Sequence, residues 1–282
     1  MAEMLWNPSK KRKNSSLIKK FIRQIPLDFD DYFALHKWSI NNMEDFWEEF
    51  WNFSGVIHSK KYDKILSNAT MPGAKWFEGS NLNYAENLLS GNSEQIAIIS
   101  TGEGRKDETY TFEELNRAVA SAQIGLIKLG LEKGTRVAAF VPNCVESVIL
   151  MLAVTATGGI WTSCSPDFGS QGVIDRFGQV KPQFLVVANG YNYNGKTFAL
   201  EEKINGVLEE IKTITNVICL DFVSTPCNLN HNSIIDYKTL LSVTNSKPDF
   251  VQLPFDHPLY IMYSSGTTGP PKSIVHGAGG TL

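Results

Sequence analysis

The segment 260–272, with the sequence YIMYSSGTTGPPK, carries the clearest chemical pattern in the chain. An apolar run of β-forming residues ends at Tyr263, and hydroxyl-bearing residues and glycines follow it at once. Backbone N–H groups beside glycine and the hydroxyls of serine and threonine can converge on phosphate oxygens, and a lysine can add a point charge. The segment predicts a strand that ends in a phosphate-binding loop. The residues expected to bind the nucleotide are Ser264, Ser265, Gly266, Thr267, Thr268, Gly269 and Lys272.

The spacing of this loop differs from that of the common mononucleotide P-loop, which has four residues between its glycines and a lysine directly after the second. Here two residues separate Gly266 from Gly269, and Lys272 follows three positions later. Pro270 and Pro271 restrict the backbone after the loop, so less conformational entropy is lost when a ligand orders it. A flexible surface linker is the alternative interpretation, but such linkers do not normally follow an apolar strand.

The sequence SSGTTGPPK resembles the signature loop of adenylate-forming enzymes, the superfamily of acyl-CoA synthetases, luciferases and peptide-synthetase adenylation domains. Further motifs narrow the resemblance to the acetoacetyl-CoA synthetase family. They are WFEGSNLNYAENLL at 76–89, SPDFG at 165–169, DRFGQVKP at 175–182 and YNGK at 193–196. Their order and spacing together carry the resemblance, which runs from about residue 6 to residue 282.

The resemblance implies an ATP-dependent ligase that activates acetoacetate in two steps. The acid attacks the α-phosphorus of Mg²⁺-bound ATP to form an acyl-adenylate, and the thiolate of coenzyme A then displaces AMP to give acetoacetyl-CoA. ATP, Mg²⁺ and coenzyme A are therefore the expected cofactors and co-substrates, with acetoacetate as the acid. The loop would position and neutralise the departing pyrophosphate. No residue is assigned as catalytic or as a metal ligand.

The resemblance also implies a domain organisation. Residues 1–92 resemble the helical N-terminal extension of acetyl-CoA-synthetase-like enzymes, and residues 93–282 resemble the start of the AMP-binding domain. Family members continue past the loop with the acyl pocket and a C-terminal domain, and none of those motifs occurs in this chain. We therefore expect an N-terminal part of the ligase that is inactive by itself. Two alternatives stay open, namely an acetyl- or propionyl-CoA synthetase and a non-catalytic nucleotide-binding remnant.

From residue 95 onward, apolar strands alternate with longer helical patterns, which predicts an α/β fold with a mostly parallel sheet and flanking helices. A capping box at 111–114 begins a helix that ends at Gly130. The expected strands cover 96–100, 136–141, 160–162, 184–188 and 217–220, and the expected helices cover 115–129, 145–156, 173–180, 200–211 and 237–241.

Ahead of this region, residues 30–53 place aromatic and acidic residues at helical spacing. They predict one amphipathic helix whose aromatic stripe packs in a core, because a nucleic-acid platform would need basic residues between the rings. A short helix from Leu82 is expected to turn Tyr84, Leu88 and Leu89 inward.

The net charge of −3 and the pI near 6.0 give no general attraction to nucleic acid or to anionic membranes. The basic residues at 10–13 are interpreted as a solvated surface. No secretory signal and no membrane-spanning stretch is apparent, so we expect a cytoplasmic protein without membrane or nucleic-acid partners and leave its oligomeric state open. The four cysteines lack metal-ligand spacing and are expected to be reduced and mostly buried thiols: Cys144, Cys164, Cys219 and Cys227.

Several other polar residues have a structural interpretation, and some of them also have a ligand-binding one. Asp167 and Ser170 can cap the helix that begins near residue 170, and Asp175 with Arg176 can form a surface ion pair. His276 can bond substrate or phosphate, or it can be a structural histidine. Four basic residues can meet coenzyme A phosphates or be solvated surface charges: Arg105, Lys106, Lys133 and Arg136.

Overall fold

The computed structural model describes residues 5–27, 29, 31–241, 247–265 and 269–282. The chain divides into two compact units. The first unit comprises Met1–Ile57 and Tyr62–Gly79, and the second comprises His58–Lys61 and Ser80–Leu282. The domain boundary expected at residue 92 stays a prediction.

The described residues of the first unit form four helices and a two-stranded hairpin. They are α1 (Lys10–Asn14), α2 (Leu17–Gln24), α3 (Tyr32–Asn41), α4 (Met43–Ser54), β2 (Lys64–Asn68) and β3 (Lys75–Glu78). The prediction of one helix over 30–53 is wrong, because Asn42 leaves the helical conformation at φ −131° and ψ 60°. Its side-chain amide donates to the carbonyl of Trp38 at 3.1 Å, so it ends α3 and starts a new helix.

The aromatic stripe of the first unit is only partly a core. Trp51 is buried, with ring centroids 4.7 Å from Phe77 and 5.3 Å from Tyr62. Trp47 and Phe50 are 36% and 41% exposed. The predicted packing of the aromatic stripe is therefore confirmed for the buried side of α4.

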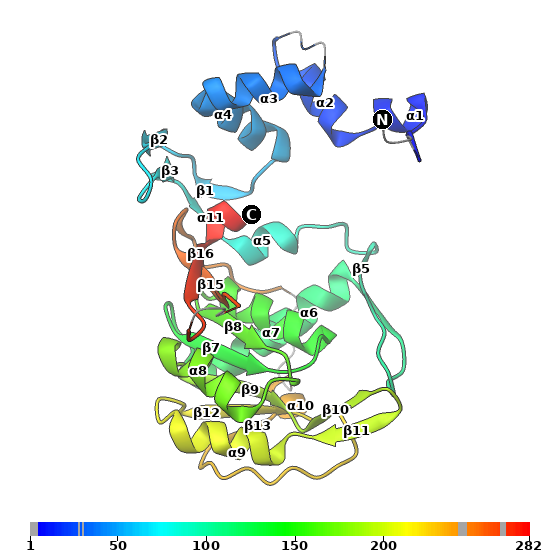
Figure 1. Ribbon diagram of the computed structural model, residues 1–282, viewed down its shortest axis with the longest axis vertical. Coiled ribbons are helices and arrows are strands. Elements are labelled where there is room, and N and C mark those ends of the chain that lie inside the picture. Colours follow the sequence, from blue (N-terminus) through cyan, green and yellow to red (C-terminus); the bar gives the residue numbers. More distant parts are fainter. Residues whose placement is uncertain (1–4, 28, 30, 242–246, 266–268) are drawn as a thin grey trace. The chain divides into compact units, whose positions relative to one another are not determined.

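A seven-stranded sheet forms the centre of the second unit (Figure 1). In spatial order its strands are β13 (Ile234–Asp236), β12 (Asn216–Leu220), β9 (Phe184–Ala188), β7 (Arg136–Phe140), β8 (Ile160–Cys164), β15 (Pro258–Tyr263) and β16 (Ser273–Gly277). Neighbouring strands are parallel except for β15 and β16, which are antiparallel. The predicted mostly parallel α/β sheet is confirmed.

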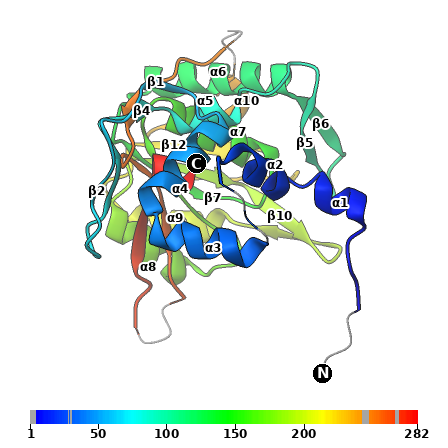
Figure 2. The same ribbon diagram turned by 90° about the horizontal axis from the view of Figure 1, so that it is seen from above.

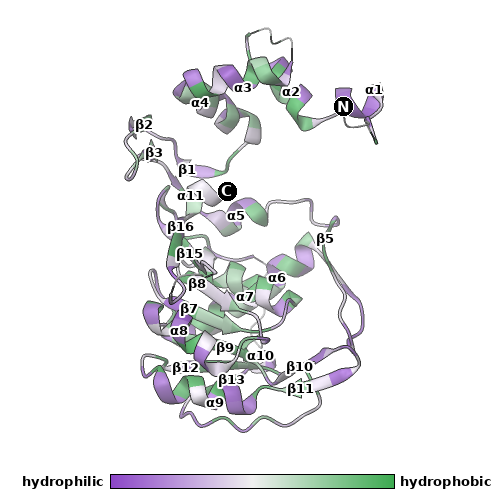
Figure 3. Cartoon of the chain, in the orientation of Figure 1, coloured by the Kyte–Doolittle hydropathy of each residue, from purple (hydrophilic) through white to green (hydrophobic). Residues whose placement is uncertain are grey.

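Helices cover both faces of this sheet. They are α6 (Phe112–Lys128), α7 (Val145–Ala156), α8 (Ser170–Val180), α9 (Glu201–Glu210) and α10 (Tyr237–Leu240). Figure 2 shows α6 on one side of the strands and α8 and α9 on the other. The central strands and α7 are mostly hydrophobic in Figure 3, whereas α8 and α9 carry hydrophilic stretches. This pattern follows from burial, since α7 packs between α6 and the sheet.

The capping box that the sequence predicted is present at the start of α6. Thr111 Oγ1 accepts from the backbone N–H of Glu114 at 3.2 Å, and the Glu114 carboxylate accepts from the Thr111 N–H at 2.9 Å. These two bonds satisfy N–H groups that the helix itself leaves without partners. The same pair holds the pKa of Glu114 below its usual range.

Short elements complete the second unit. They are β1 (His58–Lys60), β4 (Asn81–Leu82), β14 (Leu253–Pro254), α5 (Tyr84–Leu88), β5 (Ile96–Ser100), β6 (Glu108–Thr111), β10 (Gly190–Tyr193), β11 (Lys196–Ala199) and α11 (Ala278–Thr281). The YNGK motif is the tight turn between β10 and β11, where Asn194 and Gly195 have φ of 50° and 73°. Asn-Gly favours such a turn, yet the hairpin was not predicted. Leu88 is 43% exposed, so its predicted inward orientation is wrong.

Asn83 joins three segments of the second unit and is fully buried. Its amide donates to the carbonyls of Ala156 and Val251 at 3.0 and 2.8 Å, and its oxygen accepts from the N–H of Glu86 to cap α5. The side chain thus ties the start of α5 to the end of α7.

We expect Asn83→Ala to lower the free energy of unfolding by about 2–4 kcal/mol, because it removes a helix cap and the hydrogen bonds that a buried amide donates to the carbonyls of Ala156 and Val251. Urea unfolding followed by circular dichroism measures the change. The control is Asn92→Ala, since Asn92 is exposed and its side chain accepts a local bond from the N–H of Glu94. Equal midpoints for the two variants would contradict the role given to Asn83.

Arg105 and Glu146 form an ion pair that attaches the segment between β5 and β6 to α7. The guanidinium donates twice to the carboxylate, at 2.6 and 3.2 Å, and lies 4.4 Å from the ring centroid of Phe222. Burial opposes the charged form of Glu146, but the hydrogen bonds from Arg105 outweigh it and hold the pKa of Glu146 below its usual range. Beside the pair, burial raises the pKa of the Cys144 thiol to about 12.

Because the pKa of Glu146 is lowered in the folded state, its contribution to stability is present above the unfolded pKa and is lost as the pH falls. We expect Glu146→Gln to lower the free energy of unfolding at pH 7 by about 1–3 kcal/mol. The difference from the unsubstituted protein should shrink as the pH falls below about 4.3, the ordinary glutamate value. Urea midpoints measured across this range test the prediction, and a difference that is constant with pH would contradict it.

Candidate functional site

The predicted phosphate loop lies at the edge of the sheet where the parallel strands end. β15 runs parallel to β8, and β8 runs parallel to β7, so the ends of all three strands face the same way. In parallel sheets, ligands bind outside the carboxyl ends of the strands. Gly266, Thr267 and Thr268 lie outside the described residues, so the geometry rests on Ser264, Ser265 and residues 269–272.

Two hydrogen bonds close the base of this loop. The N–H of Ser264 donates to the carbonyl of Lys272 at 3.0 Å, and the N–H of Lys272 donates to Ser264 Oγ at 3.1 Å. The loop therefore connects the antiparallel strands β15 and β16, and both of its ends are fixed. Ser265, Gly269 and Lys272 are exposed, and Gly269 has a φ of +154°, which side chains disfavour.

The strand that leads into the loop is anchored by a buried threonine. Thr162 Oγ1 lies 2.8 Å from the carbonyl of Ile261 and 2.9 Å from the hydroxyl of Tyr263. Burial raises the pKa of Tyr263 to about 12, so its hydroxyl stays protonated at neutral pH. The end of β15 is thus held to β8 just before the loop begins.

Arg176 brings a positive charge from α8 to the same strand end. Its guanidinium lies 4.2 Å from the ring centroid of Phe168 and 5.9 Å from that of Tyr263, and it donates to the carbonyl of Gly172 at 2.7 Å. The predicted ion pair between Arg176 and Asp175 is wrong, because stacking on these rings turns the guanidinium elsewhere. Apart from the DRF motif at 175–177, no pattern in the sequence indicates this contact.

The caps predicted for α8 are also wrong. The N-cap is Gly169, which has no side chain that could accept a capping bond, and Ser170 is already the first helical residue. Asp167 instead accepts from Ser165 Oγ at 3.0 Å in the preceding turn. Asp175 accepts from Gln171 within the helix at 2.7 Å.

A polar hollow of about 260 Å³ lies at the carboxyl ends of β7 and β8, beside the start of α7. Its lining residues are Val141, Pro142, Asn143, Ser147, Trp161, Ser163, Cys164 and Ser165. Hydroxyl and amide groups dominate the polar part of this lining. The hollow therefore offers hydrogen-bonding groups on the same edge of the sheet as the loop.

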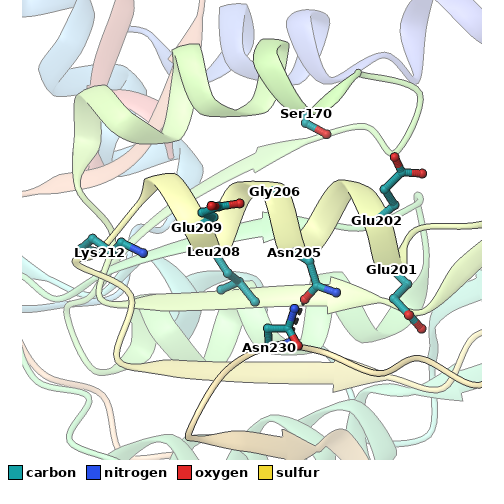
Figure 4. Close-up of a pocket in the computed structure, with 9 residues that line it drawn as sticks. All are labelled: Ser170, Glu201, Glu202, Asn205, Gly206, Leu208, Glu209, Lys212 and Asn230. Carbon is teal, nitrogen blue, oxygen red and sulfur yellow. Dashed lines mark hydrogen bonds between the residues drawn. The ribbon is translucent and has the colours of Figure 1, made fainter.

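A second hollow, of about 830 Å³, runs along α9 (Figure 4). Figure 4 shows Asn205 bonded to Asn230, with Glu201, Glu202 and Glu209 on the same helix and a single cation, Lys212, at its end. The carboxylates outnumber the lysine. This surface would repel a polyphosphate, so we do not assign it to the nucleotide.

The basic residues considered for coenzyme A have different environments. Arg105 is held by Glu146, and Arg136 donates to the carbonyls of Val180 and Lys181 at the end of α8. Both are therefore structural, which neither interpretation of the sequence anticipated. Lys106 and Lys133 are exposed.

His276, for which two interpretations were open, packs against a neighbouring strand. Its ring centroid lies 5.2 Å from that of Tyr260, its register partner on β15. This contact favours the structural interpretation. The four cysteines are free thiols as predicted, with Cys144 and Cys164 buried and Cys219 and Cys227 partly buried.

Within the described ranges, no three or more His, Cys, Asp or Glu side chains are grouped so that they could hold a metal ion. In the same part of the chain, no helix has the length and apolar character needed to cross a bilayer. The expected cytoplasmic location stays a prediction.

Comparison with known proteins gives matches over nearly the whole chain. Residues 86–282 match the family described as AMP-binding enzyme, and residues 32–88 match the acetyl-coenzyme A synthetase N-terminus. The acetoacetyl-CoA synthetase of Xenopus tropicalis is 39% identical over 295 residues, covering 100% of this chain and 44% of the relative. The malonamoyl-CoA synthetase vrtB of Penicillium aethiopicum is 35% identical over 302 residues, covering 99% of this chain and 41% of the relative.

A solved structure, that of acetoacetyl-CoA synthetase from Streptomyces lividans, has a TM-score of 0.93 and 36% sequence identity, covering 99% of this chain and 44% of that chain. The chain thus spans less than half the length of the relatives it matches. The family match extends across both the sheet and the loop. The chain belongs to the AMP-binding enzyme family.

Proposed function

We propose that this chain is the nucleotide-binding part of an acid–thiol ligase that converts acetoacetate, ATP and coenzyme A into acetoacetyl-CoA, AMP and pyrophosphate. The observation that carries the proposal is the pair of hydrogen bonds between Ser264 and Lys272, which joins the two ends of the loop at the carboxyl edge of the sheet. The relatives named as acetoacetyl-CoA synthetases support the choice of acid.

The reaction needs activation of the acid because a carboxylate oxygen is a poor leaving group. A carboxylate oxygen of acetoacetate bonds to the α-phosphorus, and the bond from that phosphorus to the bridging oxygen of pyrophosphate breaks. The sulfur of coenzyme A then bonds to the acyl carbon, and AMP leaves. A loop of hydroxyls and amides with Lys272 beside it is suited to the negative charge that grows on the departing pyrophosphate.

We propose that Mg²⁺ enters the site as the complex with ATP. The candidate residues 264–272 provide hydroxyls, amides and one lysine but no carboxylate, so they fit phosphate oxygens rather than the cation. Bound Mg²⁺ would neutralise phosphate charge, and the loop residues would orient the phosphates.

A second acid is favoured by one comparison. The relative named malonamoyl-CoA synthetase is nearly as similar to this chain as the acetoacetyl-CoA synthetases. Malonamate and acetoacetate share a carbonyl group at the 3-position, so we propose a pocket for short acids that carry this group. Acetate and propionate lack that carbonyl and are the contrasting substrates.

The test uses the purified protein in the longest form that its reading frame encodes. We expect exchange of labelled pyrophosphate into ATP when acetoacetate is added, weaker exchange with malonamate, and at least about tenfold weaker exchange with acetate or propionate because they leave the carbonyl partner unpaired. Exchange that is fastest with acetate would contradict the choice of acid. No exchange with any of these acids would contradict the ligase and favour a nucleotide-binding remnant.

We expect Lys272→Ala to reduce the rate of pyrophosphate exchange by about 100-fold, because a preorganised charge next to the leaving group is lost. Lys128→Ala, which removes an exposed lysine from α6, is the matched control and should leave the rate within about twofold. Steady-state exchange with both variants measures the difference. Equal rates would remove Lys272 from the nucleotide site.

A further inference from the structure

Gln179, in the last turn of α8, bridges to the far arm of the phosphate loop. Its side-chain nitrogen donates to the carbonyl of Pro271 at 2.7 Å, and its side-chain oxygen accepts from Ser273 Oγ at 3.1 Å. The same nitrogen donates to the carbonyl of Asp175 within α8 at 2.6 Å, which fixes the orientation of the amide. One residue, which lies within the DRFGQVKP motif, therefore makes all of these bonds.

These contacts enclose Lys272 on both sides. Gln179 holds the residue before it through the Pro271 carbonyl and the residue after it through the Ser273 hydroxyl. The backbone of Lys272 itself is paired with Ser264. The Lys272 side chain is exposed, but the backbone that carries it is held from two elements. Ser264 at the end of β15 bonds to Lys272 itself, and Gln179 of α8 bonds to the residues on either side of it.

The helix that carries Gln179 is itself firmly placed in the second unit. Val173, Phe177 and Val180 are buried against the sheet. At the carboxyl end of the helix, Arg136 of β7 donates to the carbonyls of Val180 and Lys181. A side chain on such an element can position a loop more accurately than one on another loop.

We propose that Gln179 is a positioning residue for the proposed ligase, which sets the place of Lys272 against the leaving pyrophosphate in the adenylation step. The inference rests on the proposed function. Gln179 is exposed, and exposed polar contacts contribute little to the stability of the fold. Its effect is therefore expected in the geometry of the loop and in the first half-reaction.

The kinetic test compares Gln179→Ala with Gln171→Ala in the full-length protein. Gln171 is an exposed glutamine of the same helix whose side chain bonds to Asp175 and, among the described residues, to no part of the loop, so it is the matched control. We expect Gln179→Ala to lower kcat/KM for ATP in pyrophosphate exchange by about 10- to 100-fold, because a small misplacement of a reacting group costs that much. The KM for the acid and the Tm should match those of Gln171→Ala.

Ser273→Ala provides a second variant that removes only one of the two contacts. It should cause a smaller loss than Gln179→Ala, and the double variant should lose little more than Gln179→Ala alone, because the two residues share a bond. Additive losses would overturn the shared role. A lowered Tm with unchanged kinetics would also overturn it, since that result fits a structural contact alone.

Hydrogen exchange of the Lys272 amide separates this inference from the proposed function, because it requires no activity. We expect that amide to exchange faster in Gln179→Ala than in Gln171→Ala when the protein carries no nucleotide. If the unsubstituted protein shows no acid-dependent pyrophosphate exchange, the ligase proposal fails, and the positioning role in adenylation fails with it. Hydrogen exchange of the Lys272 amide would still measure whether Gln179 holds the loop. Equal amide exchange and equal kinetics in the two variants would overturn the positioning role while leaving the ligase intact.

Discussion

The paired hydrogen bonds between Ser264 and Lys272 are the constraint on which the candidate site depends. A loop of small residues has many conformations, and binding an anion would have to remove them. Closing its base between two paired strands removes part of that freedom before any ligand arrives. The hydroxyls, the amides and the lysine then share one short segment whose ends are joined by two hydrogen bonds.

The order of the strands gives this loop its surroundings. Because β15 lies beside β8 and parallel to it, the loop emerges at the same edge as the polar hollow next to α7. Thr162 on β8 holds the last residues of β15, and Arg176 on α8 stacks near Tyr263. A loop of the same sequence at the other end of the strand would face neither the hollow nor the arginine.

The charged side chains of the second unit differ in whether they can contact a phosphate ligand. In the sequence, Arg105 and Arg136 are candidate ligand-binding cations. In the structure, Arg105 bonds to the Glu146 carboxylate and Arg136 bonds to backbone carbonyls at the end of α8. The carboxylates along α9 disfavour phosphates. Lys272 and Arg176, which lie on different elements, both bring positive charge to the carboxyl edge. The charge near the proposed nucleotide site therefore depends on where the fold places individual lysines and arginines, not on the net charge of the chain.

The sequence alone determined the features that depend on neighbouring residues. The capping box of α6, the alternation of strands and helices and the glycine- and hydroxyl-rich loop could be predicted because each rests on local spacing. The break at Asn42 and the exposed position of Leu88 were missed, since the helical pattern continues through both. The tertiary structure alone decided that Gln179 meets Pro271 and that Arg105 meets Glu146. Those partners are far apart in the chain, and only the order of the strands and the packing of the helices on them bring such residues together.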